Sequence, residues 1–408
     1  MTAFDVWHVR QQFPILDQQI NGYPLIYLDN AATTQKPEVV LQAMDHYYRN
    51  DNANVHRSAH ALAARATVAF EQARDSVAHF MNAAHREEII WTRGTTEAIN
   101  LVAYAWGMNH LQTGDEILIS AMEHHANLVP WQQVALKTGA QLRIIPLLEN
   151  GDLDLDQYRQ MLSNKTRLVA VTHVSNVLGT VNPVQEIVRL AHEVGAFALI
   201  DGAQAVAHNT IDVQALDCDF YVFSGHKVYG PTGIGVLYGK LDVLNTLVPW
   251  QFGGEMIERV TYESSTFNQA PFRFEAGTPP IAEAIGLAAA LKFIRAHMAL
   301  GAENYHQQLL QQLIDGLTAI DGVKILGEPA LRQGVISISL PQFHHHDVCQ
   351  FLDAQGVAVR SGHHCAMPLI AALGLTGTLR ISPGIYNTDQ EIMLFLNHLQ
   401  QTMELLDV

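Results

Sequence analysis

Short apolar runs alternate with helical patterns between residues 89 and 237, and this alternation constrains the fold more than any other feature of the chain. Each run is bounded by polar or turn-forming residues, as expected of a buried strand. The candidate strands are 89–91, 117–119, 142–145, 168–171, 197–200, 220–223 and 234–237. Because a helical pattern separates most of them, the sequence predicts an α/β fold with a mainly parallel central sheet and helices on both faces.

One of these helical patterns carries signals at both of its ends. Apolar residues recur three or four positions apart from Val184 to Val194. We expect Asn182 to be the N-cap, Pro183 to lie in the first turn, and Gly195 to follow the last turn.

The pattern changes after Pro279. A long Ala- and Leu-rich helix (281–297) and a second helix (305–320) precede two candidate strands, 334–340 and 357–360. We therefore expect a large α/β domain of residues 23–293 and a smaller α+β domain formed by residues 1–22 and 294–408.

Charge and composition exclude several classes of protein. Lys and Arg number 24 against 40 Asp and Glu, and the resulting net charge of −16 disfavours nucleic acid as a partner. Hydrophobic residues make up 48% of the chain, which excludes intrinsic disorder. No apolar run approaches the roughly 18 residues of a membrane span, and Asp5 lies where a secretory signal would be apolar. We expect a cytoplasmic protein with no membrane partner.

The chain has three cysteines, Cys218, Cys349 and Cys365. They cannot all pair within one chain, and so low a count does not suggest a disulfide framework. At least one thiol is therefore free.

Ligands of open α/β sheets bind beyond the carboxyl ends of the strands, so chemistry is expected directly after each apolar run. The segment 92–97 follows the first run and opens a helix with free backbone N–H groups, a glycine and two hydroxyls. Such a segment suits a phosphate group. A Thr-capped helix start without a ligand is the alternative.

Two further strand ends carry a carboxylate and an amine. Asp201 follows a very apolar run, where it is either part of an Asx turn or paired with a cationic ligand. Lys227 lies on a Gly-flanked turn 227 − 201 = 26 residues later and is a candidate Schiff-base former, although most lysines only add surface charge. Pyridoxal phosphate requires this pair: a lysine for its aldehyde and an acid for its ring nitrogen.

His124 follows the run 117–119. Its flat imidazole could stack on an aromatic cofactor ring. A capping histidine or a metal ligand is an equally good interpretation of this segment alone.

Several ordered motifs together resemble the SufS-type, group II cysteine desulfurases, also called selenocysteine lyases. The motifs are YLDNAATT (27–34), NVHR (54–57), RGTTE (93–97), EHHAN (123–127), SNVLG (175–179), DGAQ (201–204), SGHK (224–227) and RSGHHCA (360–366). They span nearly the whole chain. The resemblance implies the fold of type I enzymes dependent on pyridoxal 5'-phosphate, and a homodimer.

Roles for individual residues follow from this resemblance. It implies that Lys227 is the Schiff-base lysine, that Asp201 pairs with the pyridinium nitrogen and that His124 stacks on the ring. It also implies a further set of cofactor contacts, Gln204, Thr95, Ser224, His226 and Thr278, and a set of substrate contacts, Arg380, Asn176, Arg360 and His56. Thr278 belongs to the segment 275–279, which in this family reaches the phosphate of the partner subunit.

Cys365 separates this pattern from that of an ordinary aminotransferase. The flanking Gly362 and Pro368 place it on a loop, and sulfur is a competent nucleophile. We expect Cys218, which lies between Asp217 and Asp219 directly before an apolar run, and Cys349, which lies in an apolar helix, to be buried and inert. The resemblance implies transfer of sulfur from L-cysteine to Cys365 as a persulfide, with L-selenocysteine as a further substrate and His124 as a candidate acid. A small sulfur-acceptor protein for iron–sulfur cluster assembly would then receive the sulfur.

Two departures from the family pattern concern Ser361, where Thr or Ala is frequent, and the segment 380–385 beside the proposed carboxylate clamp. Neither removes a catalytic group.

Two alternatives remain at this stage. The 21 histidines include the clusters 344–346, 124–125 and 363–364, which could bind a metal, although adjacent side chains point in different directions and we expect no metal. Another type I pyridoxal-phosphate enzyme, such as an aminotransferase, would make Cys365 incidental.

Overall fold

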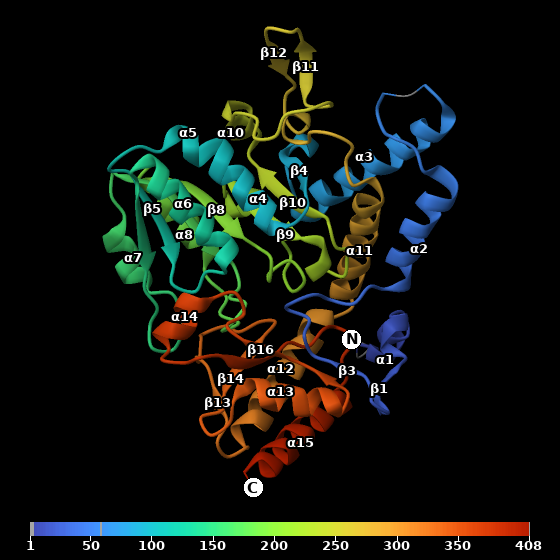
Figure 1. The fold of residues 1–408 in the computed structure, drawn as a ribbon, viewed down its shortest axis with the longest axis vertical. Coiled ribbons are helices and arrows are strands. Elements are labelled where there is room, and N and C mark those ends of the chain that lie inside the picture. The colour runs from blue at the N-terminus through green and yellow to red at the C-terminus, as the bar shows by residue number, and fades with distance from the viewer. Residues whose placement is uncertain (1–3, 58, 408) are drawn as a thin grey trace.

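A seven-stranded sheet forms the centre of the computed structural model, which describes residues 4–57 and 59–407 (Figure 1). Its strands, in spatial order, are β4 (Ile89–Thr92), β10 (Gly235–Gly239), β9 (Phe220–Ser224), β8 (Phe197–Asp201), β7 (Thr166–Thr172), β5 (Glu116–Ser120) and β6 (Gln141–Ile145). β10 runs antiparallel to β4 and β9, and the other pairings are parallel. All seven predicted strands form, and the predicted α/β fold with a mainly parallel sheet is confirmed.

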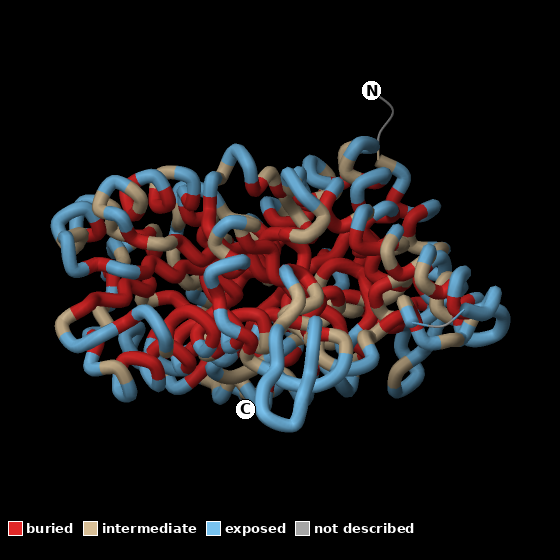
Figure 2. Tube along the Cα trace, turned by 90° about the horizontal axis from the view of Figure 1, so that it is seen from above, coloured by how far each residue is buried: buried red, intermediate tan, exposed pale blue. Residues whose placement is uncertain are grey.

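Helices cover both faces of this sheet because its strands are apolar on both sides. Val169 and Val171 of β7 belong to a core shared with α3 (Ala61–Met81), α8 (Val184–Glu193) and α11 (Ile281–Ala299). Leu168 and Ala170 belong to a second core shared with α4 (Thr95–Val102) and α6 (Val129–Thr138). Alternate side chains of a strand point to opposite faces, so one strand serves both cores. Figure 2 shows the buried residues through the middle of the molecule and the exposed ones around its rim.

The predicted N-cap of α8 is wrong by one residue. Pro183 is the N-cap, because the side chain of Asn182 instead donates a hydrogen bond of 2.8 Å to the carbonyl of Thr172. Gly195 follows the last turn at φ +75°, as predicted, and the next N–H returns to the carbonyl of Ala191 at 3.0 Å.

The C-terminal region contains an antiparallel sheet of four strands. In spatial order these are β13 (Lys324–Ile325), β14 (Ile336–Ser339), β17 (Thr378–Ile381) and β16 (Arg360–Gly362). A third core joins this sheet to α12 (Ala302–Thr318), α13 (His345–Ala354) and α15 (Asp389–Leu406). The predicted strand 334–340 is β14, and 357–360 divides between β15 (Val357–Ala358) and β16. β17 is too short to show an alternating pattern and was not predicted.

The N-terminal segment crosses between the two regions. β3 (Ile26–Tyr27) pairs in parallel with β15, and Asp29 forms an isolated bridge to Ser382, directly after β17. This path brings residues 26–30 beside the C-terminal strands, whereas Thr33 and Thr34 bond to the His226 carbonyl of the large-sheet region. The predicted domain boundaries stay a prediction.

The remaining elements are short or peripheral. They are α1 (Val6–Arg10), β1 (Gln19–Ile20), β2 (Tyr23–Pro24), α2 (Glu38–His46), α5 (Met108–His110), α7 (Leu155–Met161), α9 (Val213–Leu216), α10 (Leu241–Thr246), β11 (Ile257–Val260), β12 (Ser265–Phe267) and α14 (Met367–Ala372). Within the described residues, no single helix meets the length and hydropathy of a membrane span, although α11 and α12, bent by 77° relative to each other, meet them as a pair.

Candidate active site between the two sheets

A cavity of about 290 Å³ lies where the carboxyl ends of β8 and β9 face the C-terminal sheet. Ten of the residues named from the sequence line it: Thr95, His124, Asn176, Asp201, Gln204, Ser224, His226, Lys227, Arg360 and Arg380. Cys365 lines the same cavity. The polar residues that follow the strand ends therefore meet in one cavity, and their chemical roles stay predictions.

Lys227 and Asp201 occupy neighbouring strand ends. Asp201 is the last residue of β8, and Lys227 ends the 3-10 turn η6 (Gly225–Lys227) that follows β9. Desolvation lowers the pKa of Lys227 to about 8, although Asp201 opposes the shift. Burial raises the pKa of Asp201. Two effects oppose this shift: a hydrogen bond of 2.9 Å from the Ala203 N–H to Asp201 Oδ1, and the charge of Lys227. Asp201 therefore forms the Asx-type hydrogen bond and also lines the cavity.

The start of α4 is built for close approach of a ligand. Gly94, not a threonine, is the N-cap, and it has no side-chain capping bond. The Ser224 hydroxyl accepts a hydrogen bond from the Thr95 N–H at 2.8 Å and also lies 2.8 Å from Thr95 Oγ1. A Cβ on Gly235 would come within 2.4 Å of the Cα of Gly94, so only glycine allows this packing. The hydroxyls and the helix N-terminus together suit a phosphate group.

His226 and Gln204 complete this side of the cavity. Burial, with smaller contributions from Lys227 and Lys36, lowers the pKa of His226 to about 4. The side chain of Gln204 donates to the Ala31 carbonyl at 2.8 Å, which ties the strand end of β8 to the N-terminal segment.

His124 both caps a turn and faces the cavity. Its Nδ1 accepts from the Ala126 N–H at 3.0 Å, so the ring hydrogen is assigned to Nε2. Burial, with Lys227 as the next contribution, lowers its pKa to about 3, and the imidazole is neutral. Among residues 4–57 and 59–407, no group of three or more His, Cys, Asp or Glu is placed to hold a metal.

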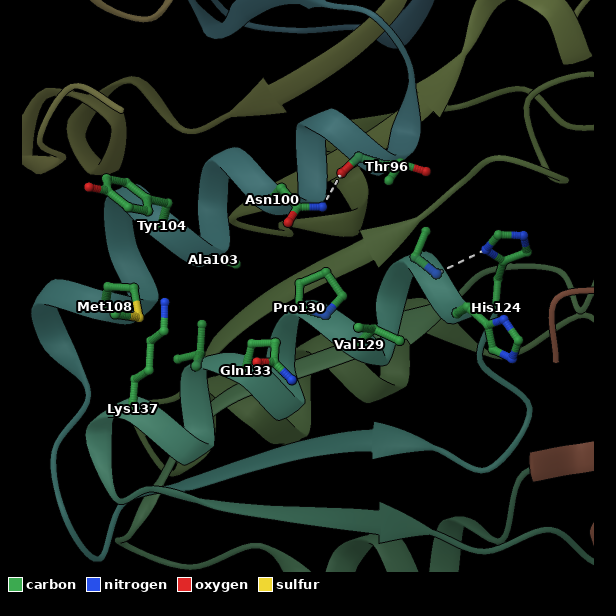
Figure 3. A pocket seen from close by; sticks show the side chains of 13 residues that line it. Thr96, Asn100, Ala103, Tyr104, Met108, His124, Val129, Pro130, Gln133 and Lys137 are labelled. Atoms are coloured by element: carbon green, nitrogen blue, oxygen red, sulfur yellow. Dashed lines mark hydrogen bonds between the residues drawn. The ribbon is translucent and has the colours of Figure 1, made fainter. Parts of the chain in front are cut away.

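His124 also stands at one end of an apolar groove of about 440 Å³ between α4 and α6 (Figure 3). Tyr104, which is 52% exposed, and Val129, which is 44% exposed, line it.

Arg380 is a buried cation with unused donors. It is 3% exposed, and its Nη1 donates to the Asn176 carbonyl at 3.1 Å and its Nη2 to Asp29 at 3.2 Å. Its Nε has no hydrogen-bond partner among the described residues. Burial lowers the pKa of Arg380, with Asp29 opposing this. A buried guanidinium with a free donor suits an anionic ligand such as a carboxylate.

Arg360 lies on β16 and is more exposed. Its Nε lies 3.0 Å from Asp29 Oδ2, and its Nη2 lies 2.9 Å from the same oxygen. The hydrogen bond to Asp29 raises the pKa of Arg360. Arg360 therefore lines the cavity with its main donors already engaged.

Cys365 is an exposed free thiol on the loop between β16 and α14. His364 and Cys365 adopt φ values of +51° and +55°, which non-glycine residues rarely do. The loop is held by a hydrogen bond of 2.7 Å from the His125 N–H to the Cys365 carbonyl. By contrast Cys218 is fully buried, and Cys349 is partly buried with its thiol 3.5 Å from the Val359 carbonyl.

His56 and Thr278 do not line this cavity. His56 lies between the carboxylates of Glu71 and Glu255, at 3.0 and 3.1 Å. Thr278 is exposed and lines a separate hollow of about 320 Å³ that also contains Trp250. Within one chain the structure therefore does not bring these two residues to the other predicted site residues, and their roles stay predictions.

Three residues of the site were not singled out from the sequence. Asp29 joins Arg360 to Arg380, as described above. Glu123 is buried, its pKa is raised to about 8 by burial, and it accepts from the Thr172 N–H at 2.9 Å. His364 lines the cavity with its Nδ1 buried and without a partner among the described residues. All three lie in motifs quoted above, but adjacency to a motif does not show which side chain turns inward.

Comparisons with known proteins agree with this geometry. The aminotransferase class-V family model matches residues 26–395. Cysteine desulfurase of Klebsiella pneumoniae is 50% identical over 99% of this chain and 100% of its own length. A probable cysteine desulfurase of Vibrio cholerae is 48% identical over 98% of both chains. The cysteine desulfurase of Synechococcus elongatus is 51% identical over 96% of this chain, which spans only 62% of that protein's length.

Solved structures show the same likeness in three dimensions. The crystal structure of the cysteine desulfurase CsdA from Escherichia coli superimposes with a TM-score of 0.91 at 41% identity and covers 99% of this chain and 100% of its own. A cysteine desulfurase from Thermococcus onnurineus gives a TM-score of 0.92 at 39% identity, with 98% of each chain covered. Relatives of these kinds depend on pyridoxal 5'-phosphate. The chain therefore belongs to the class-V aminotransferase family, and within it to the cysteine desulfurases.

Proposed function

We propose that this protein removes the sulfur of L-cysteine with the help of pyridoxal 5'-phosphate, releases L-alanine and leaves a persulfide on Cys365. The observation that carries this proposal is the meeting of three groups in one cavity. The exposed thiol of Cys365, the low-pKa amine of Lys227 and the buried guanidinium of Arg380 all line it. The names of the relatives support the same activity.

The residues around Lys227 fit the cofactor. A lysine whose pKa is lowered to about 8 has a large neutral fraction for bonding to an aldehyde. We expect the carboxylate of Asp201 to pair with a ring N–H, and the hydroxyls of Thr95, at the start of α4, and Ser224, at the end of β9, suit the phosphate. The neutral ring of His124 suits stacking. When bound, pyridoxal phosphate withdraws electrons from the substrate's Cα.

The chain's own groups bind and orient the amino acid. Arg380, whose Nη1 is held by the backbone carbonyl of Asn176, offers its buried Nε to the α-carboxylate in a low-dielectric environment, where charge-assisted hydrogen bonds are strong. The Nζ of Lys227, once free of the cofactor, takes the Cα proton. We propose that His124, whose Nε2 carries the ring hydrogen, donates that hydrogen to the substrate sulfur.

The sulfur step balances without an oxidant. The Cys365 sulfur forms an S–S bond with the substrate sulfur while the Cβ–S bond breaks, and its electron pair remains on the substrate carbon. That carbon then takes up a proton and leaves as alanine. L-cysteine and one thiol thus give L-alanine and one persulfide.

Replacing the thiol tests this proposal. We expect Cys365→Ala to abolish release of alanine and sulfide from L-cysteine in the presence of a reducing agent, because no acceptor for the sulfur remains. Cofactor absorbance should persist. The matched control is Cys349→Ala, which removes a thiol that lies outside the cavity lining.

Mass spectrometry gives the second readout. The wild-type chain incubated with L-cysteine should gain one sulfur atom on the peptide that contains Cys365. Normal turnover of cysteine by Cys365→Ala would overturn the assignment, and production of pyruvate-type keto acid without sulfide would indicate an aminotransferase.

L-selenocysteine is the second proposed substrate, because selenium is a better leaving group than sulfur at the same carbon. We propose that a small acceptor protein takes the sulfur from Cys365 for iron–sulfur cluster assembly in the cytoplasm. Exposure of the thiol, with Met367 beside it 53% exposed, supports transfer to a protein partner. Loss of persulfide from Cys365 on addition of an acceptor, followed by mass spectrometry, tests the transfer.

We also propose a homodimer. The exposed position of Thr278, its distance from the cavity of its own chain, and the apolar groove beside Tyr104 and Val129 support a second copy as partner. Glu275, the first residue of the segment 275–279, is held by two hydrogen bonds from Arg74 at 2.7 and 2.9 Å, which anchor the segment. Light scattering on a sizing column should give twice the chain mass, and a monomer at working concentration would contradict the proposal.

A further inference from the structure

Asp29 lies between the two guanidinium groups of the cavity. Its Oδ1 accepts from Arg380 Nη2 at 3.2 Å and from Arg360 Nε at 3.1 Å. Its Oδ2 lies 2.9 Å from Arg360 Nη2. Within the described residues, Asp29 itself is not part of the cavity lining, so it acts on both arginines from behind.

The backbone holds Asp29 rigidly in this place. The residue before it donates from its N–H to the Ala358 carbonyl at 2.8 Å and accepts from the Ser382 N–H at 2.8 Å. The residue after it donates to the Ser382 carbonyl at 3.2 Å. Asp29 is therefore fixed between Ala358, two residues before Arg360, and Ser382, two residues after Arg380, and its carboxylate has little freedom to leave the two guanidinium groups.

Asp29, Arg360 and Arg380 together contribute one net positive charge to the cavity. Two guanidinium groups contribute +2 and Asp29 contributes −1, giving +1. The donors are divided unequally: Arg360 uses its Nε and Nη2 on Asp29, whereas Arg380 keeps a buried Nε without a partner among the described residues. One amino-acid carboxylate matches both the net charge and the free donor.

We propose that Asp29 is a specificity-determining residue: by engaging Arg360 it leaves Arg380 as the single carboxylate receptor, and so selects amino acids with an uncharged side chain over those with a second acidic group. This inference rests on the proposed function in taking an amino acid as the ligand of the cavity. It assigns to Asp29 a positioning role, because Asp29 touches the arginines and not the substrate.

Removing the charge should widen the selectivity. In Asp29→Asn the carboxamide has nearly the same size but no longer neutralises Arg360, whose guanidinium becomes free to pair with a second carboxylate. A charge-assisted pair of this kind contributes about 1.5–3 kcal/mol, which corresponds to about tenfold to a hundredfold in affinity.

L-aspartate and L-asparagine are the matched probes, because they have the same shape and differ by one charge. Their dissociation constants are measured on the cofactor-loaded full-length protein by calorimetry and by the change in cofactor absorbance. We expect the ratio of aspartate to asparagine affinity to rise at least about tenfold in Asp29→Asn relative to wild type. Asp29→Glu, which restores the charge, should return the ratio to near the wild-type value.

The double variant Asp29→Asn/Arg360→Met identifies the group responsible. It should lose the gain in aspartate affinity, since the freed cation is gone. An unchanged ratio in Asp29→Asn, an equal loss of affinity for both probes, or a gain that survives in the double variant would each overturn the proposal. Thermal unfolding of each variant confirms that it is folded.

The outcome is separable from that of the proposed function. Binding ratios need no turnover, so a chain that released no alanine from L-cysteine could still show the predicted change in charge selectivity. Conversely, normal desulfuration together with an unchanged ratio of aspartate to asparagine affinity would support the proposed activity and overturn the proposed role of Asp29.

Discussion

The two walls of the cavity are built in different ways. The wall formed by the seven-stranded sheet presents Asp201, Ser224 and Lys227 at the ends of adjacent strands whose flanking residues are apolar and buried. The wall formed by the C-terminal sheet presents Arg380 on a buried strand but Cys365 on an exposed loop at positive φ. The first wall is suited to holding a cofactor away from water. The second combines a buried guanidinium with an exposed thiol.

Backbone strain is found at the Cys365 loop, in the wall formed by the C-terminal sheet. Positive φ at a non-glycine residue costs roughly 1–3 kcal/mol, and His364 and Cys365 both adopt it in succession. Two hydrogen bonds to the opposite wall offset the cost of this backbone conformation. The His125 N–H donates to the Cys365 carbonyl at 2.7 Å, and the Asn176 side chain donates to the His364 carbonyl at 2.7 Å. The exposed thiol is thus held against the sheet that carries Lys227.

The largest effect is expected on the wall of the large sheet. Lys227→Ala should lower the rate of sulfide release by at least about a thousandfold, because it removes both the attachment of the cofactor and the proposed base. Borohydride reduction followed by mass spectrometry should then find no cofactor attached to the chain.

Lys36 provides the control for this experiment. Its pKa is also lowered to about 8 by desolvation, but it lies outside the cavity lining and contacts the His226 carbonyl at 3.3 Å. Lys36→Met should keep the attached cofactor. Attachment that persists in Lys227→Ala and disappears in Lys36→Met would reverse the assignment of the two lysines.

The second effect concerns the wall of the C-terminal sheet and should be smaller. Arg380→Lys should raise KM for L-cysteine about tenfold to a hundredfold with a lesser change in kcat, since an ammonium group cannot match the planar, bidentate geometry of guanidinium. Arg360→Lys is the matched comparison in steady-state kinetics. Because Arg360 is exposed and engaged with Asp29, its replacement should raise KM less. Equal effects of the two substitutions would contradict the division of roles.

The smallest effect concerns a contact between the two regions. His208, which follows β8, packs against His306 of α12 with ring centroids 4.4 Å apart and ring planes tilted by 36°, and His306 Nε2 lies 3.0 Å from the Pro383 carbonyl. Burial lowers the pKa of His306 to about 4, below its ordinary value of 6.5. Below pH 6.5 the unfolded chain therefore takes up a proton that the folded chain does not. The stability contributed by this site is complete above pH 6.5 and declines as pH falls toward 4.

Unfolding at several pH values measures this decline. His306→Phe should reduce the loss of stability between pH 6.5 and 4 by about 1–3 kcal/mol, since the replaced ring no longer titrates. An unaltered pH dependence in His306→Phe would show that the contact between the regions does not titrate in this range.

Much of the large-sheet wall could be predicted, because its information is local. Apolar runs define the strands, and the polar residues directly after them, such as Asp201 and Ser224, must lie at one edge of a parallel sheet. The C-terminal wall was less predictable. β17 has four residues, Thr378–Ile381, and shows no pattern of its own, so Arg380 was found by resemblance and not by its position at a strand.

The sequence by itself determined the class of fold, the strand ends that carry the lysine and the carboxylate, and the position of Cys365 on a loop between Gly362 and Pro368, since each depends on residues close together in the chain. The tertiary structure decided which charges meet. Asp29 contacts Arg360 and Arg380 across separations of 331 and 351 residues, and only the packing of the N-terminal segment between the strands of the C-terminal region makes these contacts. Long-range pairing of this kind leaves no local pattern, because it arises from the burial of whole segments against each other.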